Sequence, residues 1–415
     1  MEKLKYKALT FDDVLLLPKY SDFLPSEASI ESKLTKNIVL KTPLISAAMD
    51  TVTESKMAIS LAETGGIGII HKNNSIEEQA AQVKTVKKYE SGIVRDPVTI
   101  NSKQSIGELR QLTSELSISG MPVVDDQKLK GIVTSRDFRY AENMDSEVSS
   151  IMTPFEKLIT VEEGFSQEDV MKLMYKNRIE KILVLDSNSN LSGLVTMKDI
   201  EKSAQHPNAT KDLSGRLQVG AALGTSEDTL ERAQALFESG VDVFVVDSAH
   251  GHSKNVIETI KMLKEKFKDV DIIGGNIATA EAATELVRAG ADAVKVGMGP
   301  GSICTTRIIA GIGVPQISAI LEIKKALVGR DINIIADGGI RFSGDIAKAI
   351  AAGADSVMLG SLFAGTEEAP GKVELFQGRS FKTYRGMGSI GAMTERDDAN
   401  RYLQEDVEAD KLVPE

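Results

Sequence analysis

A single cysteine stands in a glycine-rich loop, residues 297–307, which reads Gly-Met-Gly-Pro-Gly-Ser-Ile-Cys-Thr-Thr-Arg. Cys304 is the only thiol in 415 residues. Buried cysteines usually lie in apolar segments and behave as inert hydrophobes. This one follows three glycines, which let a backbone approach a ligand closely and can present several N–H groups to an anion. A thiol in such a loop can be held as the nucleophilic thiolate, so we interpret Cys304 as a reactive nucleophile rather than a passive thiol.

Other polar residues and glycines directly follow short apolar segments. Segments 46–50, 247–251, 337–339 and 360–361 each come after a run that is typical of a buried strand. Glycine-containing loops at such strand ends often bind phosphate. We therefore predict a phosphorylated ligand at Gly338, Gly339, Gly360 and Ser361, with Asp337 on a ribose hydroxyl. The alternative is that the glycines only form tight turns.

Two further groups of residues are weaker candidates. Residues 386–391 have the spacing of a dinucleotide-binding fingerprint, but they do not open a β-α-β unit. We interpret this segment as a glycine-rich loop that covers a ligand. The four histidines are His71, His206, His250 and His252. They do not form a convincing set of metal ligands, and a structural role is favoured.

The elements that must position these residues follow a repeating pattern. Segments 239–247, 289–297 and 352–360 each combine a helix end at glycine, an aspartate and a short apolar strand. Gly240, Gly290 and Gly353 are expected in left-handed C-cap conformations, and Thr225 and Thr279 as helix N-caps. The other expected strands are residues 44–47, 68–70, 217–221, 271–274 and 332–336. About eight short buried strands alternating with helices favour a TIM (β/α)8 barrel over an open doubly wound sheet.

Residues 93–203 interrupt this pattern with an internal duplication. Residues 131–138 resemble residues 193–200 at a shift of 62, and a repeat of this length indicates a paired module. We expect an inserted α+β module with repeats at 93–149 and 150–203, and a discontinuous barrel formed by residues 1–92 and 204–415. Each repeat carries a Thr-x-x-Asp sequence, ending at Asp137 and Asp199. It is interpreted mainly as a helix cap, with ligand binding as the alternative.

Composition narrows the class of protein. The chain is 42% hydrophobic and 26% charged, which is typical of a soluble globular protein. Its net charge of −11 argues against nonspecific nucleic-acid binding, which needs a basic face. One cysteine cannot form an internal disulfide, no apolar run approaches the length of a membrane span, and the N-terminus lacks the pattern of a signal peptide. We expect a cytoplasmic protein with no nucleic-acid or membrane partner.

Four motifs resemble those of the inosine-5′-monophosphate (IMP) dehydrogenase family. They are residues 9–16, 46–52, 299–307 and 336–340, and the duplicated insert resembles the CBS pair, or Bateman module, of that family. The likeness runs nearly from end to end. Guanosine-5′-monophosphate (GMP) reductase is the nearest alternative. The Arg401-Tyr402 pair, which resembles the mobile flap of the dehydrogenase, and the insert, usually absent from the reductase, favour the dehydrogenase.

The resemblance implies an NAD-dependent oxidation of IMP to xanthosine 5′-monophosphate in guanine nucleotide biosynthesis. A covalent Cys304 thioimidate would form and then be hydrolysed. Thr306, Arg401 and Tyr402 would act on the water. The implied nucleotide-binding residues are Ser302, Asp337, Gly338, Gly339, Gly360, Ser361, Tyr384, Gly386, Met387, Gly388 and Glu415. The implied NAD-binding residues are Asp247, Ser248, Gly297 and Gly299. Potassium would bind the backbone carbonyls of Gly299, Gly301 and Cys304.

The resemblance also implies a homotetramer and an adenine or guanine nucleotide at the CBS pair. A catalytically inactive, nucleotide-sensing CBS protein is the alternative from another functional class. One departure concerns the end of the sequence at Glu415, where family members continue. We find no convincing eighth helix, so we expect either a fragment or a barrel whose C-terminal part is missing.

Overall fold

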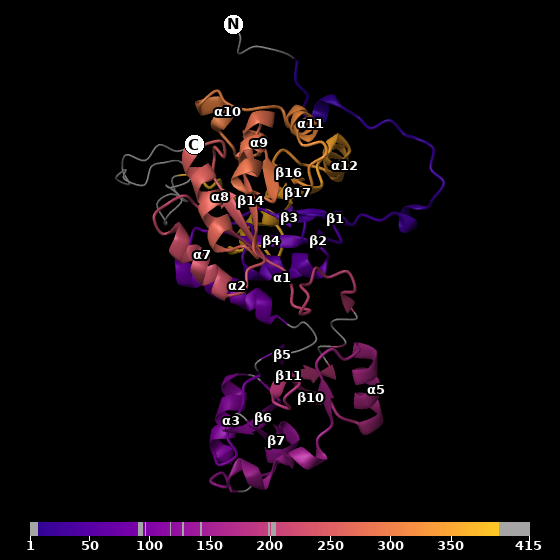
Figure 1. Ribbon diagram of the computed structural model, residues 1–415, viewed down its shortest axis with the longest axis vertical. Coiled ribbons are helices and arrows are strands. Elements are labelled where there is room, and N and C mark those ends of the chain that lie inside the picture. Colours follow the sequence, from indigo (N-terminus) through magenta and orange to yellow (C-terminus); the bar gives the residue numbers. More distant parts are fainter. Residues whose placement is uncertain are drawn as a thin grey trace. The chain divides into compact units, whose positions relative to one another are not determined.

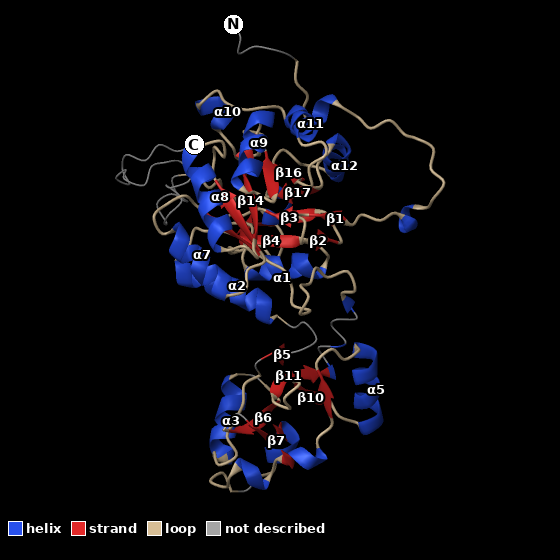
Figure 2. Ribbon diagram, in the orientation of Figure 1, coloured by secondary structure: helices blue, strands red, loops and turns tan. Residues whose placement is uncertain are grey.

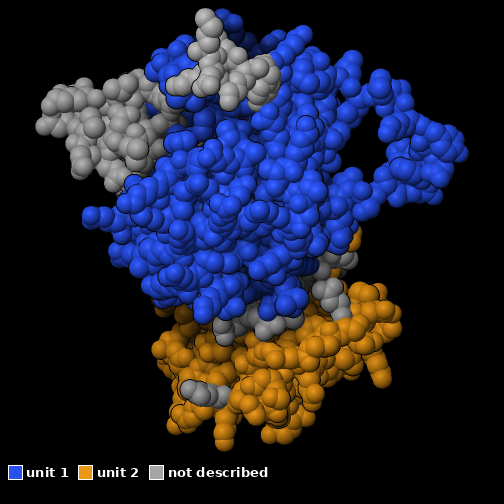
Figure 3. Space-filling view, turned by 45° about the horizontal axis from the view of Figure 1, so that its top comes forward, with its two compact units in different colours: residues 1–89, 208–415 blue, residues 90–207 orange. Residues whose placement is uncertain are grey.

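The computed structural model describes residues 7–89, 94–95, 97–116, 118–126, 128–141, 143–197, 200 and 205–389. The chain divides into two compact units. One comprises residues 1–89 and 208–415 and the other comprises residues 90–207 (Figure 3). In the described part of the chain, no helix is both long and apolar enough to cross a membrane.

Eight parallel strands of the first unit close into a barrel (Figure 1). Around the barrel they are β12 (Gly220–Leu223), β13 (Val243–Asp247), β14 (Asp271–Ile277), β15 (Ala293–Val296), β16 (Asn333–Asp337), β17 (Ser356–Leu359), β3 (Leu44–Ser46) and β4 (Ile67–Ile70). The prediction of a TIM barrel is therefore confirmed. The expectation that its C-terminal part is missing is wrong for the sheet, because all eight strands precede residue 360 and β17 pairs with β3.

Helices follow the strands in turn and form the outer layer (Figure 2). They are α1 (Ser55–Glu63), α2 (Ile76–Lys88), α7 (Thr229–Glu238), α8 (Lys254–Lys266), α9 (Ala280–Ala289), α11 (Gln316–Ala326) and α12 (Ser343–Ala352). Within the described residues, β17 is followed by the short helix α13 (Ser361–Ala364) and a hairpin of β18 (Glu374–Phe376) and β19 (Arg379–Phe381). Before the barrel come η1 (Phe11–Asp13), η2 (Pro25–Glu27), β1 (Ser32–Lys33) and β2 (Val39–Leu40).

Most predicted helix boundaries agree with the structure, with two differences. Thr279 caps α9, and its hydroxyl accepts a hydrogen bond from the Ala282 N–H at 3.3 Å. Gly240, Gly290 and Gly353 all have positive φ, as predicted. Thr225 is not an N-cap, because the chain first makes a turn in which the Thr229 N–H bonds the Ser226 carbonyl, so that α7 begins at residue 229. Strand β12 lies two to three residues beyond the predicted 217–221.

Alternation along the strands decides which residues face the inside of the barrel. Val243 and Val245 of β13 pack in the interior core, whereas Phe244 and Val246 pack in the outer core beneath the helices. The same alternation puts Ala293 of β15 and Ile335 of β16 inside. Because successive strand residues point to opposite faces, the residues two positions further on also point inward at the C-terminal ends of the strands.

The second unit contains two sheets built from similar halves. One sheet has the order β6 (Gly120–Asp125), β7 (Lys128–Thr134), β8 (Thr153–Pro154). The other has the order β5 (Val94–Arg95), β11 (Leu191–Thr196), β10 (Lys181–Leu185), β9 (Thr160–Glu162). The helices are α3 (Ile106–Glu115), α4 (Ser135–Phe138), α5 (Gln167–Asn177), η3 (Val148–Ser150) and η4 (Phe155–Lys157).

The Thr-x-x-Asp of the first repeat acts as a helix cap. The Asp137 carboxylate accepts from the Thr134 N–H at 2.6 Å and from the Thr134 hydroxyl at 2.7 Å, at the start of α4. The capping acceptor is therefore the aspartate rather than the threonine hydroxyl. Asp199, at the matching position of the second repeat, lies outside the described residues.

Candidate active site

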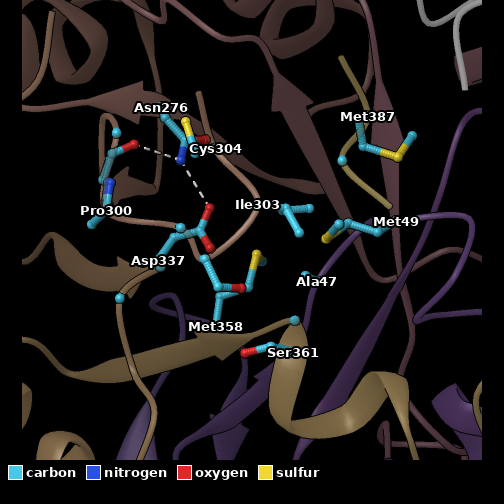
Figure 4. Close-up of a pocket in the computed structure, with 18 of the residues that line it drawn as sticks. Ala47, Met49, Asn276, Pro300, Ile303, Cys304, Asp337, Met358, Ser361 and Met387 are labelled. Carbon is cyan, nitrogen blue, oxygen red and sulfur yellow. Dashed lines mark hydrogen bonds between the residues drawn. The ribbon is translucent and has the colours of Figure 1, made fainter. Parts of the chain in front are cut away.

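A cavity of about 160 Å³ opens at the C-terminal ends of the barrel strands (Figure 4). Its wall comes from strands β13 to β17 and from the loops that follow these strands and β3. In TIM barrels this end of the strands carries the catalytic residues, because it is there that the variable loops converge. The cavity is therefore the candidate active site of the chain.

Cys304 lies in this cavity, in the loop between β15 and the short helix α10 (Thr306–Ile309). Its Sγ is 3.1 Å from the Thr306 hydroxyl, and its N–H donates to the Gly301 carbonyl at 3.1 Å. The thiol is only partly buried. A partly exposed cysteine in the cavity wall, with a hydroxyl in hydrogen-bond contact, agrees with a nucleophile better than with an inert core thiol.

The loop passes very close to the neighbouring strand at Gly297. A Cβ atom at this position would lie 1.9 Å from the Asp337 carbonyl oxygen. That oxygen is fixed by the Gln316 side-chain amide, which donates to it at 3.1 Å and to the Val296 carbonyl at 2.7 Å. Glycine at 297 is thus required for the cysteine loop to leave β15 beside the end of β16.

The structure brings most of the predicted site residues together around this cavity. Those that line it are Asp247, Gly297, Gly299, Gly301, Ser302, Cys304, Thr306, Asp337, Gly338, Gly339, Gly360, Ser361, Tyr384, Gly386, Met387 and Gly388. Ser248 is not among the lining residues; its backbone pairs with Gly275 and Asn276 of β14, and its hydroxyl accepts a hydrogen bond from the His250 N–H at 3.3 Å. Arg401, Tyr402 and Glu415 lie outside the described residues.

Tyr384 closes one side of the cavity next to the loop after β17. Burial raises the pKa of the Tyr384 phenol. A hydrogen bond with Ser302 lowers this pKa and the negative charge of Asp337 raises it, and the net effect is a raised pKa. The phenol therefore stays protonated at neutral pH and can donate a hydrogen bond. The neighbouring Gly360 makes room for it, because a Cβ there would lie 2.7 Å from the Tyr384 hydroxyl oxygen.

An ion pair anchors the segment that carries Tyr384. The Arg385 Nε donates to the Asp50 carboxylate at 3.0 Å, and Asp50 follows the first barrel strand. Residues 386–388 continue along the cavity rim. Met49, Ile303 and Met387 lie on one side of the cavity in the close-up view, and Asp337 and Asn276 on the other (Figure 4). The site therefore combines an apolar wall, suited to a flat ring, with a polar floor.

Sequence reasoning named Asp247 and Asp337 but missed two residues at the polar floor, Lys295 and Asn276. The Lys295 Nζ lies 2.9 Å from Asp247 Oδ1 and 3.0 Å from Asp337 Oδ2. The same ammonium contacts the side-chain oxygen of Asn276, whose Nδ2 donates to Asp337 at 2.8 Å and to the Gly297 carbonyl at 2.9 Å. A lysine within an otherwise apolar buried strand was the signal available in the sequence, since buried lysine is rare unless paired.

The histidines lie in other contacts. His252 Nε2 is 2.8 Å from the Glu285 carboxylate, and His71 is 3.7 Å from Glu54. Within the described ranges, no group of three or more His, Cys, Asp or Glu residues is arranged to hold a metal ion.

Comparison with known proteins decides the family. The family model described as the IMP dehydrogenase / GMP reductase domain matches residues 8–415. The chain belongs to this family. It is 55% identical to the inosine-5′-monophosphate dehydrogenase of Haemophilus influenzae over 414 residues, which is 100% of this chain and 85% of that protein. It is 54% identical to the Escherichia coli K12 enzyme of the same name over 416 residues, with the same shares covered. The chain is therefore an oxidoreductase.

A solved structure also bears on the choice within the family. GMP reductase from Trypanosoma brucei, in complex with guanosine 5′-monophosphate, matches with a TM-score of 0.87 and 41% identity, covering 100% of this chain and 87% of that one. A reductase thus aligns with the inserted unit as well as the barrel. The insert therefore does not separate dehydrogenase from reductase, contrary to our expectation. The chain is 54–55% identical to the two dehydrogenases and 41% identical to this reductase, and this difference in sequence identity favours the dehydrogenase.

Proposed function

We propose that the chain oxidises IMP to xanthosine 5′-monophosphate with NAD as the hydride acceptor. The observation that carries the proposal is the placement of the Cys304 thiol in one cavity with the strand-end residues Asp337, Gly360 and Ser361. The identity of 54–55% to named IMP dehydrogenases supports IMP as the substrate. The product would serve guanine nucleotide biosynthesis in the cytoplasm.

The polar and apolar walls of the cavity suit the parts of a purine nucleotide. Asp337 would accept hydrogen bonds from ribose hydroxyls. Ser302, Gly338, Gly339, Gly360, Ser361 and Tyr384 would bind the ribose phosphate, because they offer hydroxyls and backbone N–H groups. Gly386, Met387 and Gly388 would face the base, and Glu415 would lie near it. The apolar side chains of Met49 and Ile303 complete the wall for the purine ring.

The covalent chemistry follows from the sulfur. The Cys304 thiolate adds to C2 of the purine, forming an S–C bond, and the adjacent ring nitrogen takes up a proton. The tetrahedral C2 could then give up its hydrogen with the bonding electron pair to a hydride acceptor, which NAD would supply when bound, and a thioimidate would remain on Cys304. Water adds to C2 and the thiolate departs, giving xanthosine monophosphate and restoring the enzyme. The net reaction consumes IMP, NAD and water and yields the product, NADH and a proton.

The described residues fit the two implied small ligands. Asp247 lines the cavity on the side of β13, and its carboxylate would meet the nicotinamide riboside together with Ser248 and the backbone of Gly297 and Gly299. NAD supplies a hydride acceptor when bound. Potassium prefers carbonyl oxygens, and the Gly299, Gly301 and Cys304 carbonyls of one short loop would supply them. Thr306, with its hydroxyl 3.1 Å from the sulfur, would act on the hydrolytic water with Arg401 and Tyr402.

The test is a comparison of wild type with Cys304→Ala. Wild type should form NADH from IMP and NAD, and mass spectrometry of quenched turnover should find the nucleotide bound to Cys304. The variant should bind IMP without forming either product. Consumption of NADPH with GMP, and no NADH from IMP, would assign the reductase reaction instead. Nucleotide binding with neither reaction would assign a sensor.

We further propose that the inserted unit is a CBS pair that regulates a catalytic barrel. Its repeats would be 93–149 and 150–203, and the assembly a homotetramer. A cavity of about 720 Å³ within this unit is lined by Asp137 and by four cationic side chains, those of Arg136, Arg139, Lys157 and Lys181. Such a lining suits an adenine or guanine nucleotide, since cations bind its phosphates. Calorimetry with ATP and GTP on wild type and Arg136→Ala tests this assignment.

A further inference from the structure

Lys295 lies between two carboxylates that the proposed function gives to different ligands. Asp337 would meet the ribose of the substrate, and Asp247 the riboside of the cofactor. The Lys295 ammonium is 2.9 Å from Asp247 and 3.0 Å from Asp337, and its side chain is only 3% exposed. Because both carboxylates contact one nitrogen, they lie within about 6 Å of each other.

The barrel is built to hold this lysine. Lys295 sits two residues after Ala293, at an inward-facing position of β15. The residue beside it on β14 is Gly275, where a Cβ would come within 2.6 Å of the Lys295 Cβ. Gly275 therefore leaves the space that the lysine stem occupies, and the inward positions of four consecutive strands supply Asp247, Gly275, Lys295 and Asp337.

A buried ion triad of this kind is a poor way to stabilise a fold. Removing each charge from water costs free energy, and well-packed apolar residues of similar volume often stabilise a fold equally well. Two carboxylates this close repel each other, so that without the cation between them they tend to turn apart. A displaced carboxylate is a weaker acceptor for a ligand hydroxyl, because the hydrogen bond depends on distance and angle.

We propose that Lys295 is a positioning residue that serves both ligand half-sites at once. By holding the carboxylates of Asp247 and Asp337 in place, it keeps each oriented as an acceptor, one for the cofactor and one for the substrate. Asn276 supports the arrangement, because it bonds both Lys295 and Asp337. This inference rests on the proposed function. It predicts different effects for Lys295 and for either carboxylate. Removal of the Lys295 charge should weaken the binding of both ligands, whereas removal of one carboxylate should weaken the binding of one ligand.

The experiment measures ligand affinity in a Cys304→Ala background, which prevents turnover. Calorimetry gives the Kd of IMP, and the Kd of NAD at saturating IMP. Lys295→Met should raise both Kd values roughly tenfold or more, since a hydrogen bond to a charged group contributes about 1.5–3 kcal/mol. Asp337→Asn should raise mainly the IMP value and Asp247→Asn mainly the NAD value. Lys295→Arg should recover part of both losses, and Lys295→Gln replaces the methionine variant if that variant does not fold.

Lys87 provides a matched control. Its side chain is 4% exposed, and its ammonium is 3.0 Å from Asp212 and 2.9 Å from Asp242. Asp242 precedes β13, whereas Asp247 ends it, so this triad lies at the opposite end of the barrel. Lys87→Met should lower the thermal stability and leave both Kd values unchanged.

The outcomes separate the two proposals. Unchanged Kd values in Lys295→Met, or a loss confined to one ligand, would overturn the role of Lys295 while leaving the proposed function intact. Equal losses in Lys87→Met would assign the effect to general destabilisation and would also overturn it. If the parent protein bound neither IMP nor NAD, the proposed function would fail, and the assignment of the two carboxylates to these ligands would fail with it.

Discussion

The close approach of the cysteine loop to β16 makes Gly297→Ala the most informative single change. The added methyl group would lie 1.9 Å from the Asp337 carbonyl oxygen, whereas real Cβ contacts essentially never fall below 3.0 Å. The loop or the strand end must therefore move by about 1 Å. The carbonyl cannot yield easily, because the Gln316 amide bonds it and β15 and β16 pair directly alongside at Val296 and Ala336.

This displacement affects the catalytic geometry from both sides. Gly297 begins the loop that carries Cys304, and Asp337 is the residue expected to hold the ribose. A misplacement of about 1 Å can reduce a rate about 100-fold, which corresponds to about 2.7 kcal/mol in the activation free energy. We therefore expect kcat/KM for IMP to fall about 100-fold, with the main loss in kcat because the sulfur and C2 no longer meet correctly.

Steady-state NADH formation measures the effect, and thermal unfolding monitors the fold. Gly344→Ala is the matched control, because it lies in α12 and a Cβ there meets nothing within 4 Å. We expect it to keep full activity and to gain slightly in stability. A Gly297→Ala enzyme with kcat/KM within threefold of wild type would refute the argument from the close approach.

Three further predictions concern the cavity wall and the inserted unit. Gly360→Ala should displace the Tyr384 ring, because the tyrosine hydroxyl would lie 2.7 Å from the new Cβ. The KM for IMP should therefore rise by a factor several-fold larger than the factor by which kcat falls. A variant with the same KM for IMP as wild type would contradict this. Tyr384→Phe should raise KM for IMP about five- to tenfold by removing one hydrogen bond. Since burial raises the pKa of the phenol, wild-type KM should show no step from Tyr384 up to about pH 10, and such a step would show that the phenol titrates earlier. In the inserted unit, hydrogen bonds from the Ser102 hydroxyl and N–H hold the pKa of Asp125 below its usual value. That carboxylate therefore stabilises the fold at neutral pH and loses the effect as pH falls through its folded pKa. Ser102→Ala should raise the Asp125 pKa, measured by NMR titration, and an unchanged value would show that the hydroxyl contributes little.

The barrel could be predicted from the sequence because its strands and caps are local signals. Each strand is a short apolar run, and Gly290 and Gly353 adopt the left-handed caps that their positions indicate. Local signals fail where the chain is coupled to distant residues. Leu217 and Val219 are buried and strand-like, yet the described ladder of β12 begins at Gly220. Residue 217 instead pairs with Lys211 in a bridge outside the barrel, which no short window of sequence reveals.

The cysteine loop and the strand-end glycines could also be predicted, since glycine spacing is visible in one segment. The position of Ser248 relative to the cavity could not be predicted from the sequence, because a polar residue after a strand can turn either into the barrel mouth or into the next connection. In the structure its backbone pairs with residues 275 and 276 of β14, its hydroxyl accepts a hydrogen bond from the His250 N–H at 3.3 Å, and it is not among the residues that line the cavity. Asp247, one residue earlier, lies an even number of residues after Val243 and Val245, so its side chain faces the inside of the barrel as theirs do and lines the cavity.

The alternation of side chains along each strand also explains why Lys295 was not predicted as part of the polar floor, although Asp247 and Asp337 were. In a parallel barrel both faces of each strand are buried, so an apolar run does not reveal which residues face the interior. Once Val243, Ala293 and Ile335 are known to face inward, every second residue toward the strand end must do the same, and two aspartates and one lysine then meet at the C-terminal end of the barrel. The glycine beside the lysine is the corresponding signal on the neighbouring strand, because a lysine stem inside a closed barrel needs an adjacent position without a side chain. A charged residue that faces the barrel interior opposite a glycine on the next strand therefore indicates a buried charge at the site. This pairing can be recognised in the sequence only after the register of the strands is known.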